Sequence, residues 1–276
     1  MGEYLSIDET ALSKGELYTI ITNKKAKGKK GAIVAILAGT KVEPIIEQLL
    51  KIPRTKRNKV KEITLDMANS MKMIARKCFP KAIQVTDRFH VQKLALEALQ
   101  DMRIKHRWEA IDLENEQIKK AKFSEQEFKP QTFNNGDTRK QLLARSRYLL
   151  YKAPNNWTQN QYHRAKILFE QYPDLKEAFN LVQGLRNIFN TATSIQTAYT
   201  KLAHWYKDVE QNGFRAFNTI ANTITLNYRS ILNYFINRST NASAESFNAK
   251  IKAFRSQFRG VKNTEFFLFR LTQIFA

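Results

Sequence analysis

Two kinds of hydrophobic pattern alternate over residues 1–90 of the chain. Short runs rich in β-branched and aromatic side chains predict strands at 4–8, 17–22, 32–37, 62–66 and 82–87. Apolar residues at helical spacing predict helices at 42–50 and 69–79. This order predicts an α/β fold with a mixed sheet of strand order 3-2-1-4-5, in which the first three strands are antiparallel.

Polar segments separate these predicted elements. The lysine-rich segment 23–30 contains Gly28 and is predicted to connect two strands of a hairpin. The basic run 54–59 follows Pro53, which ends the helix before it, and is predicted to be a solvated loop.

Beyond Val91 the strand signals almost vanish and helical spacing dominates. The apolar spacing predicts helices at 94–108, 142–151, 161–172, 175–189 and 193–209. We therefore expect a first part of the α/β core at 1–95, an all-helical insertion at 96–232 and the rest of the core at 233–276. The aromatic residues of the insertion are interpreted as core side chains rather than base-stacking platforms: Trp108, Trp157, Trp205, Tyr148, Tyr151, Tyr162 and Tyr206.

The last part of the chain contains an amphipathic basic helix. Its apolar face is formed by residues at i, i+4, i+7 and i+11: Phe247, Ile251, Phe254 and Phe258. A second face with similar spacing carries polar residues: Asn241, Glu245, Asn248 and Lys252. This helix is thus expected to be buried on one side and to present a carboxylate between two amides.

Composition changes the picture through charge. The chain has 276 residues and a formal net charge of +21, with 43% hydrophobic residues, enough for a folded core. A charge this positive favours polyanions, and nucleic acid is the leading partner because binding releases counterions from its phosphates. The single cysteine, Cys78, excludes a disulfide framework and a cysteine-rich zinc site. With no secretory leader and no long apolar run, a cytoplasmic protein without a membrane partner is expected.

Carboxylates at strand ends are the candidate chemistry. Asp8 ends the first strand and Asp66 the fourth, and these strands are neighbours in the predicted sheet. Asp87 ends the fifth strand, which lies one position further out in the predicted sheet. Side-chain alternation places Asp8 and Asp66 on polar faces of their strands, whereas Asp87 shares its face with Ile83 and Val85. With Glu245 from the distant helix, Asp8 and Asp66 are therefore the predicted ligands of two Mg²⁺ or Mn²⁺ ions, and Asp87 an adjacent supporting acid.

Each of these residues also has an ordinary structural interpretation. An aspartate at a strand end is commonly a turn residue or a helix cap, and Asp66 fits a cap before the helix at 69–79. Asp87 and His90 are three residues apart, and as an isolated pair they are best interpreted as a capping interaction. The chain contains no glycine-rich phosphate loop and no recognisable local motif of a nucleophilic triad.

Three motifs in order resemble the DDE transposases of bacterial insertion sequences, and most closely the ISL-three family, which is related to the Mutator-like group. The motifs are Ser6-Ile-Asp8-Glu-Thr10, then Leu65-Asp66-Met67 before a helix ending in Phe79-Pro80, with Asp87-Arg88-Phe89-His90 following, and finally Asn241-x-x-x-Glu245-x-x-Asn248. The resemblance covers essentially the whole chain. It implies an RNase H-like catalytic core interrupted by a helical insertion, with the catalytic and metal-binding triad Asp8, Asp66 and Glu245. The alternative triad Asp66, Asp87 and Glu245 remains open at this stage.

The resemblance also implies supporting and DNA-binding residues. Asp87 and His90 match the family's Asp/Cys-x-x-His signature, and Asn241 and Asn248 flank the glutamate. Phosphates of DNA are expected to contact Arg88, Lys250, Lys252, Arg255 and Arg259.

The implied activity is metal-dependent hydrolysis at the ends of an insertion sequence, followed by attack of the freed 3′-hydroxyl on target DNA. Such enzymes act as oligomers on transposon ends and target DNA, here at the nucleoid. Relatives usually carry an N-terminal region that recognises the element's ends, so this chain either works with a separate recognition polypeptide or is truncated. A nuclease or resolvase of the same fold, and an inactive DNA-binding remnant, are the alternative functions.

Overall fold

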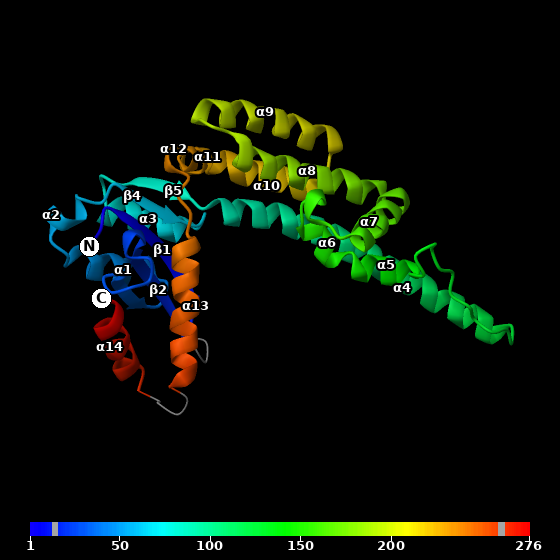
Figure 1. Ribbon diagram of the computed structural model, residues 1–276, viewed down its shortest axis with the longest axis horizontal. Helices are drawn as coiled ribbons and strands as arrows, with labels where there is room; N and C mark the ends of the chain where they lie inside the picture. The colour runs from blue at the N-terminus through cyan, green and yellow to red at the C-terminus, as the bar shows by residue number, and fades with distance from the viewer. Residues whose placement is uncertain (13–15, 259–262) are drawn as a thin grey trace. The chain divides into compact units, whose positions relative to one another are not determined.

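A computed structural model describes residues 1–12, 16–258 and 263–276 of the chain. The chain divides into two compact units. The α/β unit comprises residues 1–91, 193–195 and 224–276, and the helical unit comprises residues 92–192 and 196–223. Strands and the blue and red segments belong to the first unit, whereas the green and yellow helices belong to the second (Figure 1).

The α/β unit is built on a five-stranded mixed sheet of order β3-β2-β1-β4-β5. Its strands are β1 (Tyr4–Ala11), β2 (Leu17–Asn23), β3 (Ile33–Ala38), β4 (Glu62–Leu65) and β5 (Ile83–Thr86). Strand β2 is antiparallel to both β1 and β3, while β4 is parallel to both β1 and β5. The predicted strand order, the α/β class and the RNase H-like arrangement are confirmed.

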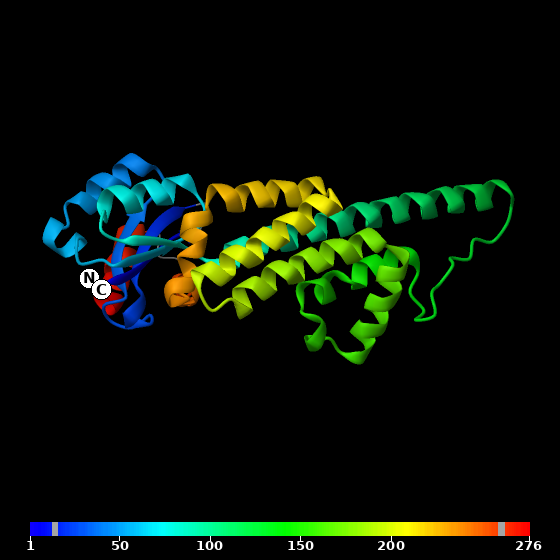
Figure 2. The ribbon, with the colours of Figure 1, turned by 90° about the horizontal axis from the view of Figure 1, so that it is seen from above.

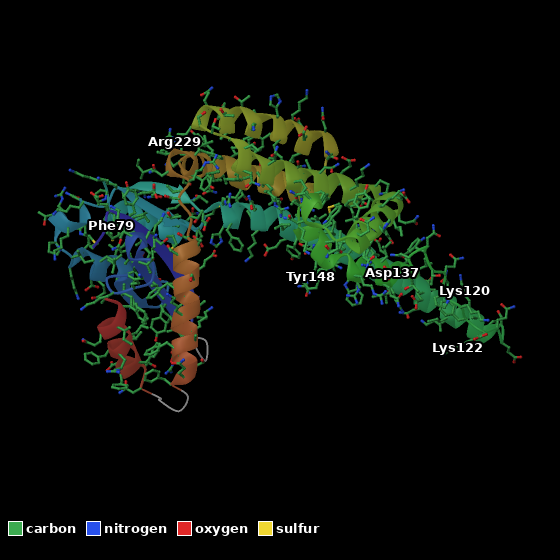
Figure 3. All side chains as sticks on the ribbon, in the orientation of Figure 1. Phe79, Lys120, Lys122, Asp137, Tyr148 and Arg229 are labelled. Atoms are coloured by element: carbon green, nitrogen blue, oxygen red, sulfur yellow. The ribbon has the colours of Figure 1, made fainter. Side chains whose placement is uncertain are left out.

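One face of the sheet is covered by α1 (Val42–Leu50) and α3 (Asn69–Cys78). Alternation along the strands sends Leu5, Ile7, Ile63 and Leu65 to this face. These side chains form a buried core with the apolar stripes of the two helices, to which Phe79 is added after α3 (Figure 3). The central strands are thereby held by burial of apolar surface, the main stabilising term in a core of this kind.

The other face is covered over β2 and β3 by α13 (Ala242–Gln257) and α14 (Thr264–Phe275). Phe247 and Ile251 of α13 are buried against Tyr18 and Ile20 of β2, and Phe254 packs at the margin of this cluster. The apolar face predicted for the basic helix is therefore confirmed. The sequence analysis did not predict α14, which supplies Phe267 and Leu271 to the same cluster.

The basic run at 54–59 is not a solvated loop, and this prediction was wrong. After Pro53 the chain forms a single turn of helix, α2 (Arg54–Arg57), and Arg57 is buried. Its Nε donates to the carbonyl of Ile52 at 2.9 Å, and its Nη1 donates to the carbonyl of Cys78 at 2.6 Å. Arg57 thus satisfies a carbonyl at the end of α3 that lacks a partner within the helix. The hairpin connection after β2 contains a 3₁₀ turn, η1 (Lys24–Ala26).

The helical unit contains the segments in which helices were predicted. It includes most of α4 (Arg88–Phe123), α9 (Ile195–Asn212) and α10 (Arg215–Leu226), and all of α5 (Arg139–Arg145), α6 (Arg147–Tyr151), α7 (Gln159–Gln171) and α8 (Pro173–Thr191) (Figure 1, Figure 2). Helix α4 runs far past the predicted end at residue 108. Its distal part is mostly exposed and has no apolar stripe, so hydrophobic spacing gave no signal there. The sequence analysis also missed α10, and α11 (Tyr228–Leu232) and α12 (Tyr234–Asn237) of the α/β unit.

The aromatic residues of the helical unit divide into two groups. Trp205 is buried, and its Nε1 donates to the carbonyl of Leu181 at 2.9 Å, as a core side chain should. Trp108, Tyr148 and Tyr162 are 59%, 68% and 56% exposed. Their interpretation as core residues was wrong, because each lies on the outward side of its helix. Within the described ranges, no helix combines the length and the apolar character needed to cross a membrane.

Arg57 offers a test of this packing. Replacing it with Met keeps an apolar stem but removes the donors to Ile52 and Cys78, leaving both carbonyls without these partners. We expect Arg57→Met to lower the free energy of unfolding by about 1–3 kcal/mol, measured by urea denaturation. Arg54→Met, an exposed position in the same turn, should change it by no more than about 0.5 kcal/mol. Equal losses in the two variants would contradict the structural role of Arg57.

Candidate active site

Three acidic residues of the α/β unit lie where a strand ends or a helix begins, and a fourth, Asp8, lies inside a strand. The prediction that Asp8 ends its strand was wrong, because β1 continues to Ala11. Asp8 lies within β1, Asp66 directly follows β4, Asp87 lies between β5 and α4, and Glu245 lies in the first turn of α13. Because β1 and β4 are parallel neighbours with Ser6 opposite Thr64, Asp8 and Asp66 occupy the same end of the sheet. The contacts of each carboxylate show how closely they are associated.

Asp8 is the most informative of the four. Its Oδ1 accepts the backbone N–H of Glu9 at 2.9 Å, and its Oδ2 accepts Nδ2 of Asn248 on α13 at 2.6 Å. Burial raises the pKa of Asp8, and the charges of Asp66 and Glu245 raise it further, while the Glu9 N–H and His90 lower it. The structure therefore brings Asp8, Asp66 and Glu245 within electrostatic reach of one another, with His90 among them.

Asp66 shapes the turn between β4 and α3. Its Oδ1 accepts the backbone N–H of Ala68 at 2.8 Å, and Ala68, not Asp66, is the N-cap of α3. Interpretation of Asp66 as the helix cap was therefore wrong. Its Oδ2 accepts no hydrogen bond from the described residues. Asp66 also raises the pKa of Glu9, after burial, which is the larger cause. One carboxylate oxygen is thus held in place while the other remains available to a ligand.

Asp87 is only 1% exposed and binds backbone on both sides of its carboxylate. Oδ1 accepts the N–H of Phe89 at 3.1 Å in the first turn of α4, so Asp87 caps this helix. The predicted capping partner was His90, whose N–H instead donates to the Asp87 carbonyl at 3.2 Å. Oδ2 accepts the N–H of Asn241 at 2.9 Å, at the N-cap of α13. Asp87 therefore joins the end of β5 to the beginnings of two helices.

A potential metal-ligand group includes Asp87, His90 and Glu245. One ligand atom from each of these residues lies within 4.8 Å of the other two. Asp87 is buried, His90 is half-buried and Glu245 is exposed, so the group opens to solvent on the Glu245 side. The sequence analysis had placed His90 in a supporting role, and the structure places it directly beside the glutamate.

The two predicted amides both contact the sheet. The Oδ1 of Asn241 accepts the hydroxyl of Ser6, and Nδ2 of Asn248 binds Asp8. The remaining polar atoms of these amides, Nδ2 of Asn241 and Oδ1 of Asn248, are buried without a hydrogen-bond partner. Unsatisfied buried polar atoms are uncommon and call for an explanation, such as a ligand that completes the site.

A second layer of polar residues lies beneath the acids and was missed by the sequence analysis. The Nζ of Lys24 donates to Oγ1 of Thr64 at 2.6 Å and to Oε1 of Glu62 at 3.3 Å. Asn237 donates to Oε2 of Glu62 at 3.0 Å. Burial lowers the pKa of Lys24, while Glu62 and Asp87 act against that shift. The alternation of Glu62, Thr64 and Asp66 along β4 was the available signal, because these positions share one face.

The predicted DNA-contacting cations lie on or beside α13. Lys250 and Lys252 are exposed, and a Cβ atom on Gly28 would come within 3.2 Å of the Lys250 Nζ. Arg255 is half-buried with its guanidinium 5.0 Å from the ring centre of Phe267, and Arg88 lies 5.9 Å from that of Tyr234. Arg259 lies outside the described residues.

This donor set fits divalent cations such as Mg²⁺ and Mn²⁺. Such ions prefer oxygen ligands, and Asp8, Asp66 and Glu245 supply carboxylate oxygens from three separate elements. Burial is the main cause of the raised pKa of Asp8, and the repulsion from Asp66 and Glu245 that adds to it is the repulsion that a bound cation relieves. The unpaired Oδ1 of Asn248 adds a neutral oxygen beside Asp8.

Removing one acidic charge tests this electrostatic coupling. Glu245→Gln should bring the pKa of Asp8 in the metal-free protein closer to its ordinary value, measured from the carboxyl ¹³C shift. Because folding raises this pKa, ionisation of Asp8 costs folded-state stability as the pH rises from the ordinary value through the raised one. Above that interval, removing the Glu245 charge should recover up to about 1 kcal/mol, the scale of partly exposed charge pairs.

Glu265→Gln is the matched control, since Glu265 also lies in the first turn of a helix. Both substitutions remove a favourable charge from a helix N-terminus, so the comparison isolates the effect on Asp8. An unchanged Asp8 pKa in Glu245→Gln would show that the two carboxylates do not interact.

The comparisons with known proteins agree with this geometry. The family model of the ISL3-type DDE transposases, described as transposase, matches residues 5–271. The transposase for insertion sequence element IS1001 of Bordetella parapertussis is 23% identical over 277 residues, which cover 99% of this chain and 61% of that protein. The chain thus spans about three fifths of the length of this relative. No solved structure matches the chain significantly. Since the family match extends over nearly all its residues, the chain belongs to the ISL3 family of transposases.

Proposed function

We propose that this chain cleaves DNA strands at the ends of an insertion sequence and joins the freed 3′-hydroxyl ends to target DNA. The observation that carries the proposal is that Asp66 and Glu245 lie close enough to Asp8 to raise its pKa, in addition to the larger effect of burial. The three residues come from β1, the end of β4 and α13. The chain is basic and attracts a polyanion, but its carboxylates repel phosphates. Phosphates can therefore approach these carboxylates only if cations lie between them. Family membership supports DNA as that polyanion.

Asp8, Asp66 and Glu245 are the residues proposed to hold two Mg²⁺ or Mn²⁺ ions. When bound between such carboxylates, a pair of divalent ions activates the attacking oxygen and neutralises charge on the leaving oxygen of a phosphodiester. The protein's own contribution is positional. The Ala68 N–H holds one oxygen of Asp66, and Asn248 holds one oxygen of Asp8, so each carboxylate keeps a fixed orientation.

Asp87 and His90 are proposed as positioning residues rather than members of the triad. Both oxygens of Asp87 already accept backbone N–H groups, from Phe89 and Asn241, which commits this carboxylate to the helix starts. By holding the N-cap of α13, Asp87 fixes Glu245 one turn later. His90, which has a ligand atom within 4.8 Å of one of Glu245, is close enough to help position that carboxylate.

Phosphate contacts are proposed for the cations that share α13 with Glu245. Lys250 and Lys252 are exposed and can pair with phosphates, while Arg255 and Arg88, each beside an aromatic ring, have less freedom. Arg259 is included in this proposal on the strength of the sequence alone. Cations on the helix that carries the catalytic glutamate would place the scissile phosphate beside it.

Assembly is the remaining part of the proposal. Joining two element ends to one target requires two active sites, so the chain is expected to act as an oligomer on DNA at the nucleoid. Recognition of the terminal sequences is assigned to a separate polypeptide or to a segment outside this chain. The 61% share of the relative's length leaves room for such a segment.

Substitution of Asp66 tests the chemistry. Asp66→Asn should lower the rate of Mg²⁺-dependent strand cleavage by at least about 100-fold, because a metal ligand loses its charge while the turn-forming oxygen is kept. DNA affinity measured in EDTA should stay within about twofold, since no phosphate contact is removed. Asp112→Asn, the same change at an exposed position of α4, should retain full cleavage.

The substrate for this assay should carry a free 3′-hydroxyl, so that cleavage and joining are scored together. Joined products in the parent chain support a transposase, and cleavage without joining would replace the proposal with a nuclease or resolvase. Full cleavage by Asp66→Asn would remove Asp66 from the triad.

Divalent ions should stabilise the protein in a pH-dependent manner. At about 100 times the dissociation constant, Mn²⁺ should add about 2.7 kcal/mol to the free energy of unfolding, measured by thermal shift near neutral pH. As the pH falls, protons compete for Asp8, and its raised pKa makes the stabilisation disappear at a higher pH than for an ordinary aspartate. Glu245→Gln should reduce the shift and Glu265→Gln should not. A shift that is the same in both variants would place the ion elsewhere.

A further inference from the structure

The helical unit contains an arginine buried without a carboxylate. Arg103 of α4 is 4% exposed. Its Nε donates to Oε1 of Gln100 at 2.7 Å and its Nη1 to the carbonyl of Leu143 at 2.9 Å, both neutral acceptors. Its Nη2 donates to none of the described residues. A guanidinium in this setting has lost much of its hydration without gaining an opposite charge, which is an unfavourable arrangement unless an anion completes it.

Other arginines surround this one. Arg107 is one helical turn further along α4, and the carbonyl of Arg147 on α6 accepts Nε2 of Gln100 at 3.3 Å. Burial is the main cause that lowers the pKa of Arg103, and the charges of Arg107 and Arg147 lower it further. Arg186 of α8 binds the carbonyl of Tyr151, the last residue of α6, at 2.8 Å. We call Arg103, Arg107, Arg147 and Arg186 the α6 arginine cluster.

No carboxylate neutralises this cluster within the part of the chain that the structure describes. None of its four members is within ion-pair distance of an aspartate or glutamate there. Repulsion among these like charges destabilises the folded protein, and a bound anion would relieve it.

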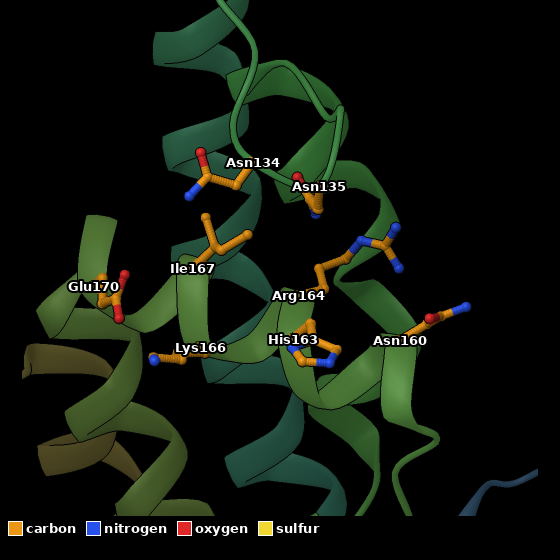
Figure 4. Close-up of a pocket in the computed structure, with 8 residues that line it drawn as sticks. All are labelled: Asn134, Asn135, Asn160, His163, Arg164, Lys166, Ile167 and Glu170. Atoms are coloured by element: carbon orange, nitrogen blue, oxygen red, sulfur yellow. The ribbon is translucent and has the colours of Figure 1, made fainter.

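A neighbouring part of the same unit shows the contrast. Arg145 and Arg164 both pair with the buried Asp137, whose pKa they lower against the opposing effect of burial. Arg164 also lines a hollow of about 640 Å³, where Glu170 adds another negative charge (Figure 4). Arg145 and Arg164 are thus balanced by an acid within the protein, whereas the arginines around α6 are not.

Exposed aromatic rings accompany the cluster. Tyr148 on α6 is 68% exposed, and the guanidinium of Arg147 lies 5.4 Å from its ring centre (Figure 3). Tyr151, at the end of α6, is 39% exposed. Cations next to exposed aromatic faces suit nucleic acids, which offer phosphates for the first and bases for the second. An acidic protein segment would use the cations and leave the rings without a partner.

We propose that the surface around α6 is a DNA-binding site of the helical unit, in which the exposed Arg107 and Arg147 contact the phosphodiester backbone and the buried charge of Arg103 adds to the attraction. The choice of DNA as the polyanion rests on the proposed function, but the site itself uses none of the residues of the candidate active site. It binds without reading sequence, since guanidinium–phosphate contacts carry no base information. The helical unit thereby contributes DNA affinity to a chain whose α/β unit holds the proposed catalytic carboxylates.

The salt dependence of binding tests this proposal in the whole chain. A short labelled duplex is titrated in EDTA, so that no cleavage occurs, and the dissociation constant is measured over a range of salt concentrations. The double variant Arg107→Gln/Arg147→Gln leaves the buried Arg103 in place. Because each lost phosphate contact lowers the slope of log K against log salt by about 0.9, the slope should fall by about 1.8.

The control removes the same charge from elsewhere in the helical unit. Lys207→Gln/Arg215→Gln changes two exposed cations on α9 and α10 and should leave the slope nearly unchanged. An equal fall in both double variants would reduce the effect to net charge and overturn the site, as would an unchanged slope in Arg107→Gln/Arg147→Gln. Competition by polyglutamate as strong, per charge, as that by DNA would overturn the assignment to nucleic acid.

This measurement is independent of catalysis. A smaller slope in the Arg107→Gln/Arg147→Gln variant supports the site even in a chain that cleaves no DNA, in which case only the proposed function fails. Conversely, cleavage that depends on Asp66 together with an unchanged slope would leave the proposed function intact and remove the α6 site.

Discussion

The buried carboxylate of Asp87 joins more elements of the α/β unit than any other side chain described above. It follows β5, caps the start of α4 and accepts the N–H at the N-cap of α13. A buried carboxylate is unfavourable alone, and two N–H donors with Lys24 nearby make this one acceptable. The geometry of the candidate site depends on it, because Glu245 is placed by the start of α13 and Asp8 is held by Asn248 of the same helix.

Much of this arrangement could be predicted from local patterns. Alternation along the strands and the order of elements predict the sheet and place Asp8 beside Asp66, because each element has its own signal within a short stretch of sequence. The contacts that complete the site could not be predicted in this way. The bond from Asn241 to Asp87 joins residues 154 positions apart, and which donor meets which oxygen depends on how α13 packs on β2. Arg57 and the distal part of α4 were missed for a related reason, since neither has an apolar period.

The two units carry uncompensated charge of opposite sign. The α/β unit gathers negative charge at the end of its sheet, although the chain as a whole carries +21. The helical unit leaves arginines around α6 without acidic partners, while Asp137 neutralises others a short distance along the same unit. Uncompensated charge of either sign reduces folded-state stability and favours binding of the opposite charge. Divalent cations would compensate the carboxylates of the α/β unit, and a polyanion would compensate the arginines of the helical unit. Neither ligand alone would compensate both.

The distance in sequence between the carboxylates has a consequence for the newly made protein. Asp8 and Asp66 leave the ribosome well before Glu245 and Asn248, because Asn248 lies 240 positions after Asp8, which it binds. Closing so long a loop costs little more than closing a shorter one, because the entropy grows only with the logarithm of length. The insertion is therefore thermodynamically tolerable, yet it delays the meeting of the acids until the whole insertion has been translated. A nascent chain that has not yet reached Glu245 thus lacks the complete set of acids, however well its first strands have folded.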